Sequence, residues 1–311
     1  MCSPAPCSAT GCAPRIRLER LHTMRTPPAS DPHLPIVDFA DADAPRAFVA
    51  SLHHTGFAVL KNHPLDQALV DGIYAEWLNF FHSAAKFDYP FNTQTHDGYF
   101  STAVSETAKN HSTKDVKEFF HVYPWGQYPA QVSDAALRYY ARGKELATTL
   151  LQWVQDGSPP DVRARYSQPL PAMLEGSEHT LLRVLHYPPL SGQEEPGAMR
   201  AAPHGDINLL TILPAATEPG LQVLGTNGDW HDVPCDFGLL IVNIGDMLEE
   251  ASGRYFPSTV HRVLNPVGEA ARKSRVSLPL FLHPRKEVVL SDRYTVGSYF
   301  EERIRELRIN G

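Results

Sequence analysis

The amino-acid sequence predicts an α+β fold that is mainly β: a double-stranded β-helix (jelly-roll) core, preceded by an N-terminal helical module and followed by a C-terminal helix. Long stretches in the first half place apolar residues at three- and four-residue steps, as helices do. From about Thr180 the chain changes to short β-rich runs broken by Gly, Pro, Asn and Asp. Because no long helix separates these runs, we expect antiparallel strands in a closed or sandwiched sheet.

The N-terminal half predicts two short strands and three helices. The strands cover residues 34–39 and 56–60. Asp43 precedes a proline in the first turn, which is typical of a helix start. Asp66 caps a second helix, and a third helix covers about 134–155. The second helix carries an apolar stripe that we assign to the core, made of Leu69, Ile73, Trp77, Phe80 and Phe81.

The C-terminal half predicts eight strands and one helix. The helix covers about 298–308. The predicted strands are rich in β-branched and aromatic residues and are bounded by turn formers. They are 181–187, 207–213, 221–224, 230–233, 239–244, 259–264, 276–282 and 287–290.

We divide the chain into a leader, residues 1–30, a helical module, residues 31–160, and a jelly-roll domain, residues 161–311. The last two are expected to form one unit, since 311 residues with 42% hydrophobic content can bury a large core. The leader is rich in Ser, Ala and Pro, which predicts disorder. Its three cysteines, Cys2, Cys7 and Cys12, suggest a metal clip only weakly, and Met24 is an alternative to Met1 as the true start.

Composition argues against several classes of partner. A net charge of −7 and a pI of about 6.1, with scattered Lys and Arg, argue against nucleic acid. No apolar run approaches the roughly 18 residues of a membrane helix, and the first thirty residues lack a signal-like apolar stretch. The sequence therefore predicts a cytoplasmic protein without a membrane partner, and no feature indicates an obligate protein partner.

A His-x-Asp triplet and a distant histidine are the candidate metal ligands. His204 and Asp206 are two positions apart, so on a strand both side chains would point to one face. No other histidine here is followed two positions later by Asp, and His261 lies within the predicted strand 259–264. Two imidazoles and one carboxylate suit Fe(II) and leave coordination positions open. Taken alone, the triplet favours a surface histidine beside a turn aspartate, and only this context favours a metal.

Arg275 and Ser277 are candidate carboxylate binders. They are two positions apart at the start of an apolar run, so they share a strand face. The planar guanidinium matches a carboxylate in geometry, and a ligand carboxylate would offset the cost of burying that charge. The alternative for Arg275 is a surface salt bridge. Phe281 has the same strand parity, so it faces either the same cavity or the core.

These residues lie within a resemblance that runs from about Leu34 to Phe300. The sequence resembles the isopenicillin N synthase-like family of 2-oxoglutarate/Fe(II) dioxygenases. The matching N-terminal segments are 34–38, 56–57, 62–63, 80–81, Lys86, 98–99, Asp115 and 117–118. The matching C-terminal segments are 182–189, 203–206, 220–223, Trp230, 242–246, 258–263 and 275–277.

The resemblance implies a non-haem dioxygenase that uses Fe(II), 2-oxoglutarate and O2. It would oxidise a small molecule by hydroxylation, desaturation or cyclisation, with release of succinate and CO2. The iron would be held by His204, Asp206 and His261. The prime substrate cannot be deduced, because specificity in such proteins lies in loops and in the helical part.

The resemblance also implies that Arg275, Ser277 and Tyr187 hold 2-oxoglutarate. Tyr187 matches the last tyrosine of the family's Asn-Tyr-Tyr-Pro pattern. In this chain Leu185 stands where Asn is usual, and His186 replaces the first Tyr. Any contact made by that Asn is therefore lost or replaced. A strand aromatic without a cofactor role is the alternative for Tyr187.

Two other enzymatic functions remain compatible with these residues, whereas a third alternative, a binding protein, is disfavoured because all three candidate ligands are present. An ethylene-forming relative would fragment 2-oxoglutarate itself. An isopenicillin N synthase-like oxidase would need no 2-oxoglutarate and would use Arg275 and Ser277 to hold its substrate. A non-catalytic β-barrel binding protein would keep the fold without the three ligands. Ligation by His186, His231 or His283 is not expected.

Overall fold

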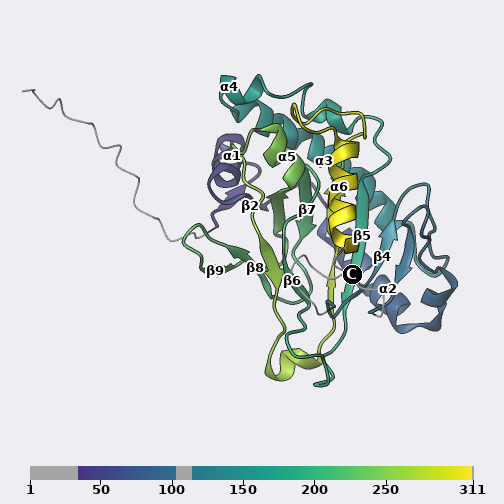
Figure 1. Cartoon of the computed structure of the whole chain (residues 1–311). Helices are drawn as coiled ribbons and strands as arrows, with labels where there is room; N and C mark the ends of the chain where they lie inside the picture. Colours follow the sequence, from purple (N-terminus) through teal and green to yellow (C-terminus); the bar gives the residue numbers. More distant parts are fainter. Residues whose placement is uncertain (1–33, 103–113, 310–311) are drawn as a thin grey trace, which may run out of the picture. The chain divides into compact units, whose positions relative to one another are not determined.

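A computed structural model describes residues 34–102 and 114–309 (Figure 1). The predicted leader, its cysteines and Met24 lie outside these residues. Two β-sheets form the centre of the described part, and helices cover the larger sheet. The predicted jelly-roll sandwich with helical additions is confirmed.

Six α-helices occur within the described residues, and the three predicted N-terminal helices are among them. Asp66 caps the second of these, since its side chain accepts a hydrogen bond from the Ala68 N–H at 2.9 Å. Asp43 stands at the predicted start of the first helix, where it pairs with Arg46 instead of capping the backbone. The helices are α1 Ala44–Thr55, α2 Gln67–His82, α3 Ala135–Gly157, α4 Pro160–Arg163, α5 Asp246–Ala251 and α6 Val296–Ile309.

The larger sheet has nine strands in the part of the chain that the structure describes. Its order is β1-β2-β10-β7-β13-β5-β4-β3, and β12 also pairs with β5. β1 and β2 are parallel, and the other strand pairs are antiparallel. The strands are β1 Ile36–Asp38, β2 Phe57–Lys61, β3 Gly98–Phe100, β4 Glu118–Val122, β5 Leu181–Tyr187, β7 Leu210–Pro214, β10 Leu240–Ile244, β12 Arg275–Ser277 and β13 Leu280–Leu282.

The smaller sheet, as far as the chain is described, has four antiparallel strands in the order β6-β11-β8-β9. They are β6 Ala201–His204, β8 Leu221–Leu224, β9 Trp230–Asp232 and β11 His261–Val263. All of these strands come from the C-terminal half, whereas the larger sheet combines strands of both halves. The N-terminal module therefore extends the sheet of the jelly roll.

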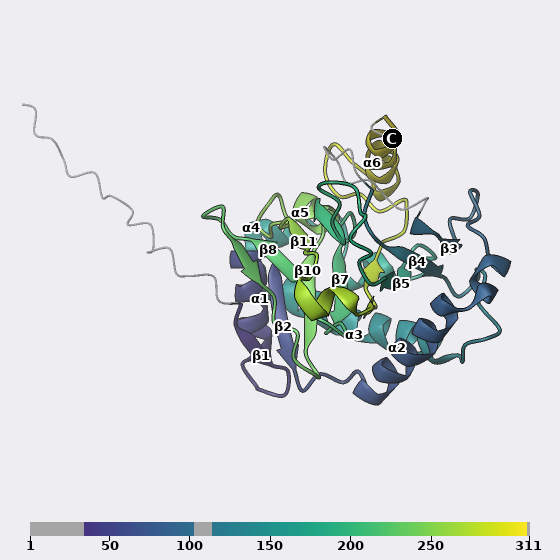
Figure 2. The same cartoon turned by 90° about the horizontal axis from the view of Figure 1, so that it is seen from below.

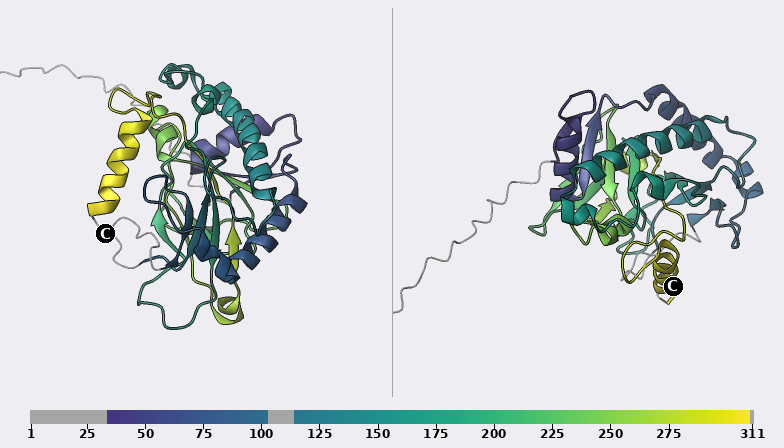
Figure 3. Two further views of the ribbon diagram at one scale, coloured as in Figure 1. Left: turned by 90° about the vertical axis from the view of Figure 1, so that its right-hand side faces the viewer. Right: turned by 90° about the horizontal axis from the view of Figure 1, so that it is seen from above.

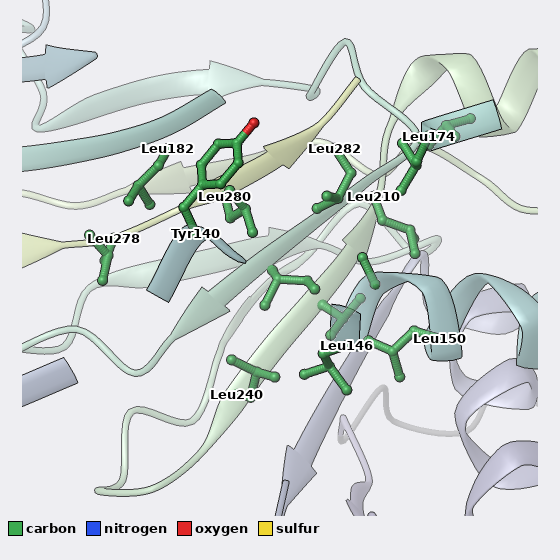
Figure 4. Packing of buried hydrophobic residues seen from close by; sticks show 14 of the residues in the cluster. Tyr140, Leu146, Leu150, Leu174, Leu182, Leu210, Leu240, Leu278, Leu280 and Leu282 are labelled. Carbon is green, nitrogen blue, oxygen red and sulfur yellow. The ribbon is translucent and has the colours of Figure 1, made fainter. Parts of the chain in front are cut away.

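Two apolar clusters lie on opposite faces of the larger sheet. On the outer face, α1, α2 and α3 pack against the strands (Figure 2), and α6 lies on the side away from α3 (Figure 3). Leu146 and Leu150 of α3 meet Leu210, Leu240 and other strand leucines there (Figure 4). Burial of such side chains contributes roughly 1.5–3 kcal/mol each.

None of the described helices combines the length and apolar character needed to cross a bilayer.

The second cluster fills the space between the two sheets, which we call the sandwich interior. Its members come from both sheets and include Phe57 of β2, Phe119 of β4, Leu185 of β5 and Val263 of β11. Strand side chains alternate between faces, so one set of positions on each strand lines this interior. Tyr187 belongs to this set, and Arg275 and Ser277 are the cross-strand partners of Tyr187 and Leu185.

The structure differs from the predicted elements in several places. Predicted strand 276–282 is divided into β12 and β13 around Pro279, because proline lacks the N–H that a continuous ladder needs. Predicted strand 287–290 is wrong, since only an isolated bridge between Val289 and Thr295 forms there. Predicted strand 207–213 begins only at Leu210, and β6 was not anticipated. Strands β3 and β4 lie in the region expected to be helical.

Candidate metal centre

His204, Asp206 and His261 converge at one point. His204 is the last residue of β6 and His261 the first of β11, and the two are directly opposite each other in the antiparallel pair. One ligand atom from each of the three residues lies within 4.8 Å of the others. His261 Nε2 is 3.8 Å from Asp206 Oδ1. The three side chains can therefore coordinate one ion.

The predicted basis of this convergence, a shared strand face, is wrong. We expected His204 and Asp206 to share a strand face, but β6 ends at His204 and Asp206 lies in the connection to β7. The connection is fixed by a backbone hydrogen bond from Asp246 N to Asp206 O at 2.7 Å. Gly245 allows this close approach, because a Cβ there would be 2.2 Å from the carbonyl oxygen of Asn208.

Hydrogen bonds select the atoms that face the metal position. His204 Nδ1 donates to the Ala202 carbonyl at 2.7 Å, and His261 Nδ1 contacts the Thr259 carbonyl at 3.3 Å. A carbonyl can only accept, so each Nδ1 carries the proton and each Nε2 keeps its lone pair. This pattern is typical of histidines that bind metals.

The carboxylate of Asp206 is oriented in the same way. Its Oδ2 accepts hydrogen bonds from Thr211 Oγ1 and from Asn243 Nδ2, the latter at 2.8 Å. The other oxygen, Oδ1, is the one that faces His261. Thr211 lies on β7 and Asn243 on β10, so the larger sheet holds a carboxylate that emerges from the smaller one.

The protonation states favour a cation. Burial, and then the positive charge of a protonated His261, lower the pKa of His204 to about 4, so its imidazole is neutral at pH 7. Burial raises the pKa of Asp206, but the two histidines and the hydrogen bonds from Asn243 and Thr211 outweigh it and lower the pKa. A carboxylate beside the neutral imidazole of His204 suits a divalent transition metal.

Arg275, Ser277 and Tyr187 also lie together. Arg275 is opposite Tyr187 in the pairing of β12 with β5, and Ser277 is opposite Leu185. All of them are buried, and the Arg275 guanidinium carbon is 5.1 Å from the centre of the Tyr187 ring. Arg275 Nε donates to the Glu218 carbonyl at 2.8 Å, whereas no described residue accepts a hydrogen bond from its Nη1. A buried, partly unpaired guanidinium is a natural binding group for an anion.

Leu185 and His186, the two residues that differ from the family pattern, point to opposite faces of β5. Leu185 belongs to the sandwich interior, so an apolar side chain stands where the family has Asn. His186 points to the outer face, where its Nδ1 donates to Glu118 Oε1 at 2.7 Å and its Nε2 meets Ser274 Oγ at 2.9 Å. His186 therefore lies on the opposite side of β5 from the sandwich interior, and its hydrogen-bond partners are not the candidate ligands.

Two buried cations near the site, Arg200 and Lys117, were not predicted from the sequence. Arg200 precedes β6, is 1% exposed, and places its guanidinium 5.9 Å from the Tyr187 ring. Burial and the charge of Arg275 lower the pKa of Arg200. No sequence pattern marks it, since it precedes an unpredicted strand.

The other missed cation is Lys117, which pairs with Asp115 at 2.8 Å while both are buried. Asp115 also accepts a hydrogen bond from the Ala202 N–H at 3.0 Å, which anchors β6 beside the candidate ligands. The charge of Lys117 helps to lower the pKa of His204. Both residues belong to the segments that carry the family resemblance, but nothing in their sequence indicated this proximity.

Comparison with known proteins places these features in a family context. The family model of the 2OG-Fe(II) oxygenase superfamily matches residues 178–284. A second model, for the N-terminal part of a non-haem dioxygenase in morphine synthesis, matches residues 34–141. Together the two matches include most of the described chain and every candidate site residue.

Individual relatives agree with these matches. Gibberellin 2-beta-dioxygenase 1 of Arabidopsis thaliana is 25% identical over 273 residues, covering 81% of this chain and 78% of the relative. A crystal structure of a Shewanella oneidensis protein assigned as an oxygenase is 54% identical, with a TM-score of 0.81, and covers 89% of this chain and 99% of that one. A full-length Neurospora crassa protein, solved in complex with alpha-KG, has a TM-score of 0.72 at 22% identity, covering 88% and 95%, and shares the fold.

Proposed function

Because this chain belongs to the 2-oxoglutarate/Fe(II) oxygenase superfamily, and is thus a dioxygenase that oxidises a small molecule, we propose that His204, Asp206 and His261 hold its iron. The observation that carries the proposal is the orientation of the three donor atoms. Two Nε2 lone pairs and one carboxylate oxygen converge, and each side chain is fixed by hydrogen bonds of its other polar atom. Such a set would hold a divalent iron and leave coordination positions open for small molecules.

We assign 2-oxoglutarate to a position beside Arg275, Ser277 and Tyr187. The unpaired Nη1 of Arg275 supports this assignment, because a buried cation without an acceptor is costly and a carboxylate would satisfy it. Ser277 and Tyr187 place hydroxyl groups on the same face of the sheet. These three residues would hold the carboxylate of the cofactor that is remote from the iron.

When bound, iron and 2-oxoglutarate supply a two-electron oxidation in which R–H, O2 and 2-oxoglutarate give R–OH, CO2 and succinate. The chain contributes position and exclusion of water. Apolar side chains of the sandwich interior, among them Phe57, Phe119 and Val263, surround the site and keep bulk water away. Phe57 packs edge-on against the ring of His261 with centroids 5.6 Å apart, which holds that ligand in place.

The ligand assignment is tested by removing single donors. We expect His204→Ala and Asp206→Ala to abolish Fe(II)-dependent succinate release and to weaken Fe(II) binding in anaerobic equilibrium dialysis. His231→Ala, which removes a histidine of β9 in the same sheet, is the matched control and should keep both. Undiminished release in either ligand variant would refute the assignment.

The two enzymatic alternatives are not favoured by the relatives, whose names describe dioxygenases and a 2-oxoglutarate-dependent demethylase. They remain simple to separate by experiment. Ethylene in the headspace would indicate fragmentation of 2-oxoglutarate. An anaerobic Fe(II) enzyme that develops no charge-transfer band with 2-oxoglutarate would indicate an oxidase that does not use it.

A further inference from the structure

We propose that Arg200 is a second cation for the carboxylate of 2-oxoglutarate that is remote from the iron. Together with Arg275 it would make the cofactor position select keto acids that carry a second negative charge. The inference deepens the proposed function and rests on it, because it concerns the anion assigned to Arg275. Arg200 stands outside the segments that carry the family resemblance.

Arg200 lies directly before β6, and the main chain around it is held by hydrogen bonds. Its N–H donates to Asn265 Oδ1 at 2.8 Å, and Asn265 Nδ2 donates to the Ala198 carbonyl at 2.7 Å. The carbonyl of Met199, between these two residues, accepts from the Val116 N–H at 2.8 Å. The Arg200 side chain therefore starts from a well-anchored main chain.

The Arg200 side chain extends to the position assigned to the cofactor. Its guanidinium carbon is 5.9 Å from the centre of the Tyr187 ring, and that of Arg275 is 5.1 Å from the same centre. Arg200 Nη2 donates to the carbonyl of Lys273, two residues before Arg275, at 3.0 Å. Arg200 precedes a strand of the smaller sheet, whereas Arg275 belongs to the larger one. The two guanidinium groups are therefore neighbours of one ring although they come from different parts of the fold.

Both guanidinium groups are buried and keep an N–H without an acceptor. Arg200 is 1% exposed and Arg275 is 2% exposed. Each donates one hydrogen bond to a main-chain carbonyl, but within the described residues no atom accepts from Arg200 Nε or from Arg275 Nη1. A buried donor of this kind costs free energy unless an acceptor binds to it. Each arginine thus has a donor that a ligand can satisfy.

The charges near the two arginines also favour an anion. Burial, and then the charge of Arg275, lower the pKa of Arg200. Glu218 is the carboxylate that raises this pKa, but its Oε1 lies 3.4 Å from Lys273 Nζ, so an ammonium group already balances its charge. Two buried like charges are costly unless an anion accompanies them. The remote carboxylate of 2-oxoglutarate is the anion that the proposed function brings to Arg275.

A structural role for Arg200 is the alternative. The hydrogen bond to the Lys273 carbonyl would then only join the start of β6 to the segment before β12. A neutral donor could make that bond without placing a second charge beside Arg275. The two roles differ in a measurable respect. A structural role affects the binding of every keto acid, whereas a charge acts on those that carry a remote carboxylate.

The test compares 2-oxoglutarate with 2-oxopentanoate, which has the same chelating end but a methyl group in place of the remote carboxylate. Affinity is measured by anaerobic titration of the charge-transfer band of the full-length protein with Fe(II). The increase in Tm that each keto acid causes in the metal-free protein is a second readout, which does not depend on iron. Urea unfolding confirms that each variant is folded.

The variants separate charge from packing at position 200. Arg200→Gln keeps N–H donors and Arg200→Met keeps apolar bulk, but both remove the charge. We expect each to weaken 2-oxoglutarate binding on the order of 10- to 100-fold and to leave 2-oxopentanoate binding nearly unchanged. Arg200→Lys should retain part of the affinity for 2-oxoglutarate, because it keeps a positive charge without the planar fork. The increase in Tm with 2-oxoglutarate should follow the same order.

Arg285→Gln is the matched control. Arg285 is half-buried, and its Nη1 donates to the Ala172 carbonyl at 2.8 Å, so it resembles Arg200 in bonding to the main chain. The preference for 2-oxoglutarate over 2-oxopentanoate should be the same in this variant as in wild type. An unchanged preference in Arg200→Gln, or equal losses for both keto acids, would overturn the proposal. If neither neutral variant folds, Arg200→Lys decides: a loss confined to 2-oxoglutarate supports the proposal, and any other result contradicts it.

Failure of this inference is distinguishable from failure of the proposed function. If wild type with Fe(II) and 2-oxoglutarate produces no charge-transfer band, the cofactor assignment itself is wrong. If the band forms and Arg275→Gln removes the preference for 2-oxoglutarate, but Arg200→Gln does not reduce it, only the role of Arg200 is wrong.

Discussion

At the scale of single residues, the orientation of Asp206 depends on hydrogen bonds that the sequence motif does not contain. The motif supplies a carboxylate, but which oxygen faces the metal position is decided by Thr211 and Asn243, which both donate to Oδ2. Outer-shell partners of this kind typically change metal affinity by roughly 10- to 100-fold when they are removed. The two residues stand on strands adjacent in space but separated in sequence.

We therefore predict that Thr211→Val weakens Fe(II) binding by roughly 10- to 100-fold. Valine keeps the shape of threonine but cannot donate to Asp206, so the carboxylate loses one of the bonds that fix its rotamer. The measurement is anaerobic Fe(II) titration of the folded protein. Thr211→Ser restores a hydroxyl and should recover most of the affinity, and equal affinities in wild type and Thr211→Val would contradict the prediction.

Candidate site residues were found in the sequence where a short motif marks them. His204 and Asp206 are close in sequence, and Arg275 and Ser277 are two positions apart on one strand, but the convergence of His204 and Asp206 depends on the connection after β6 and not on a shared strand face. Arg200 and Lys117 were missed, because their proximity to the site depends on tertiary pairing: Arg200 lies beside Tyr187 of β5, and Lys117 pairs with Asp115, which holds β6.

At the scale of elements, a buried ionic network joins α2, β3, β4 and β5 on the outer face of the larger sheet. Glu118 of β4 is at its centre and accepts from His186 of β5 at 2.7 Å. Its other oxygen accepts from the Tyr99 hydroxyl of β3 and, at 2.9 Å, from Lys86, which follows α2. Glu118 is 6% exposed, so it depends on these donors for its charge. The network ties the N-terminal module to the jelly roll.

This network predicts a specific pH dependence of stability. Burial alone would raise the pKa of Glu118, but hydrogen bonds from His186, Tyr99 and Lys86 outweigh it and lower the pKa from its ordinary value of 4.5. A carboxyl whose pKa is lower in the folded state binds fewer protons there than in the unfolded chain. Its contribution to the free energy of unfolding is complete above about pH 4.5 and is lost as the pH falls through the folded-state pKa.

We predict that Glu118→Gln is less stable than wild type by about 1–3 kcal/mol at pH 7, and that this difference shrinks below pH 4.5. The measurement is the free energy of unfolding by urea at several pH values. Glu145→Gln, on the exposed side of α3, is the matched control and should differ little from wild type at any pH. A difference for Glu118→Gln that does not change with pH would contradict this account.

Elements were predicted well where the local pattern is clear. The stripe Leu69 to Phe81 predicted α2, and the β-rich run 181–187 predicted β5 with both bounds correct. Strand β4 was missed because Glu118 and His121 interrupt its apolar residues, and both are buried only through partners supplied by other elements. Predicted strand 287–290 failed for the opposite reason: its local pattern is β-like, but only an isolated bridge forms in that segment.

At the scale of the whole molecule, the candidate metal centre lies where the two sheets meet. His204 ends β6 and His261 begins β11 in the smaller sheet, and Asp206 lies in the connection from β6 to the larger sheet. The residues that orient Asp206 belong to the larger sheet. An ion bound by these three side chains would therefore link the two sheets, in addition to the apolar contacts between them.

Fe(II) should consequently stabilise the entire fold and not only the site. Binding to the folded state alone raises the free energy of unfolding by about 2.7 kcal/mol when free metal is 100 times the Kd. We predict a higher Tm with anaerobic Fe(II) than with a chelator, a further increase on addition of 2-oxoglutarate, and no metal-dependent increase in His204→Ala. The measurement is differential scanning calorimetry at pH 7, where His204 is neutral and needs no deprotonation to bind. An equal metal-dependent increase in His204→Ala would place the stabilising ion elsewhere in the molecule.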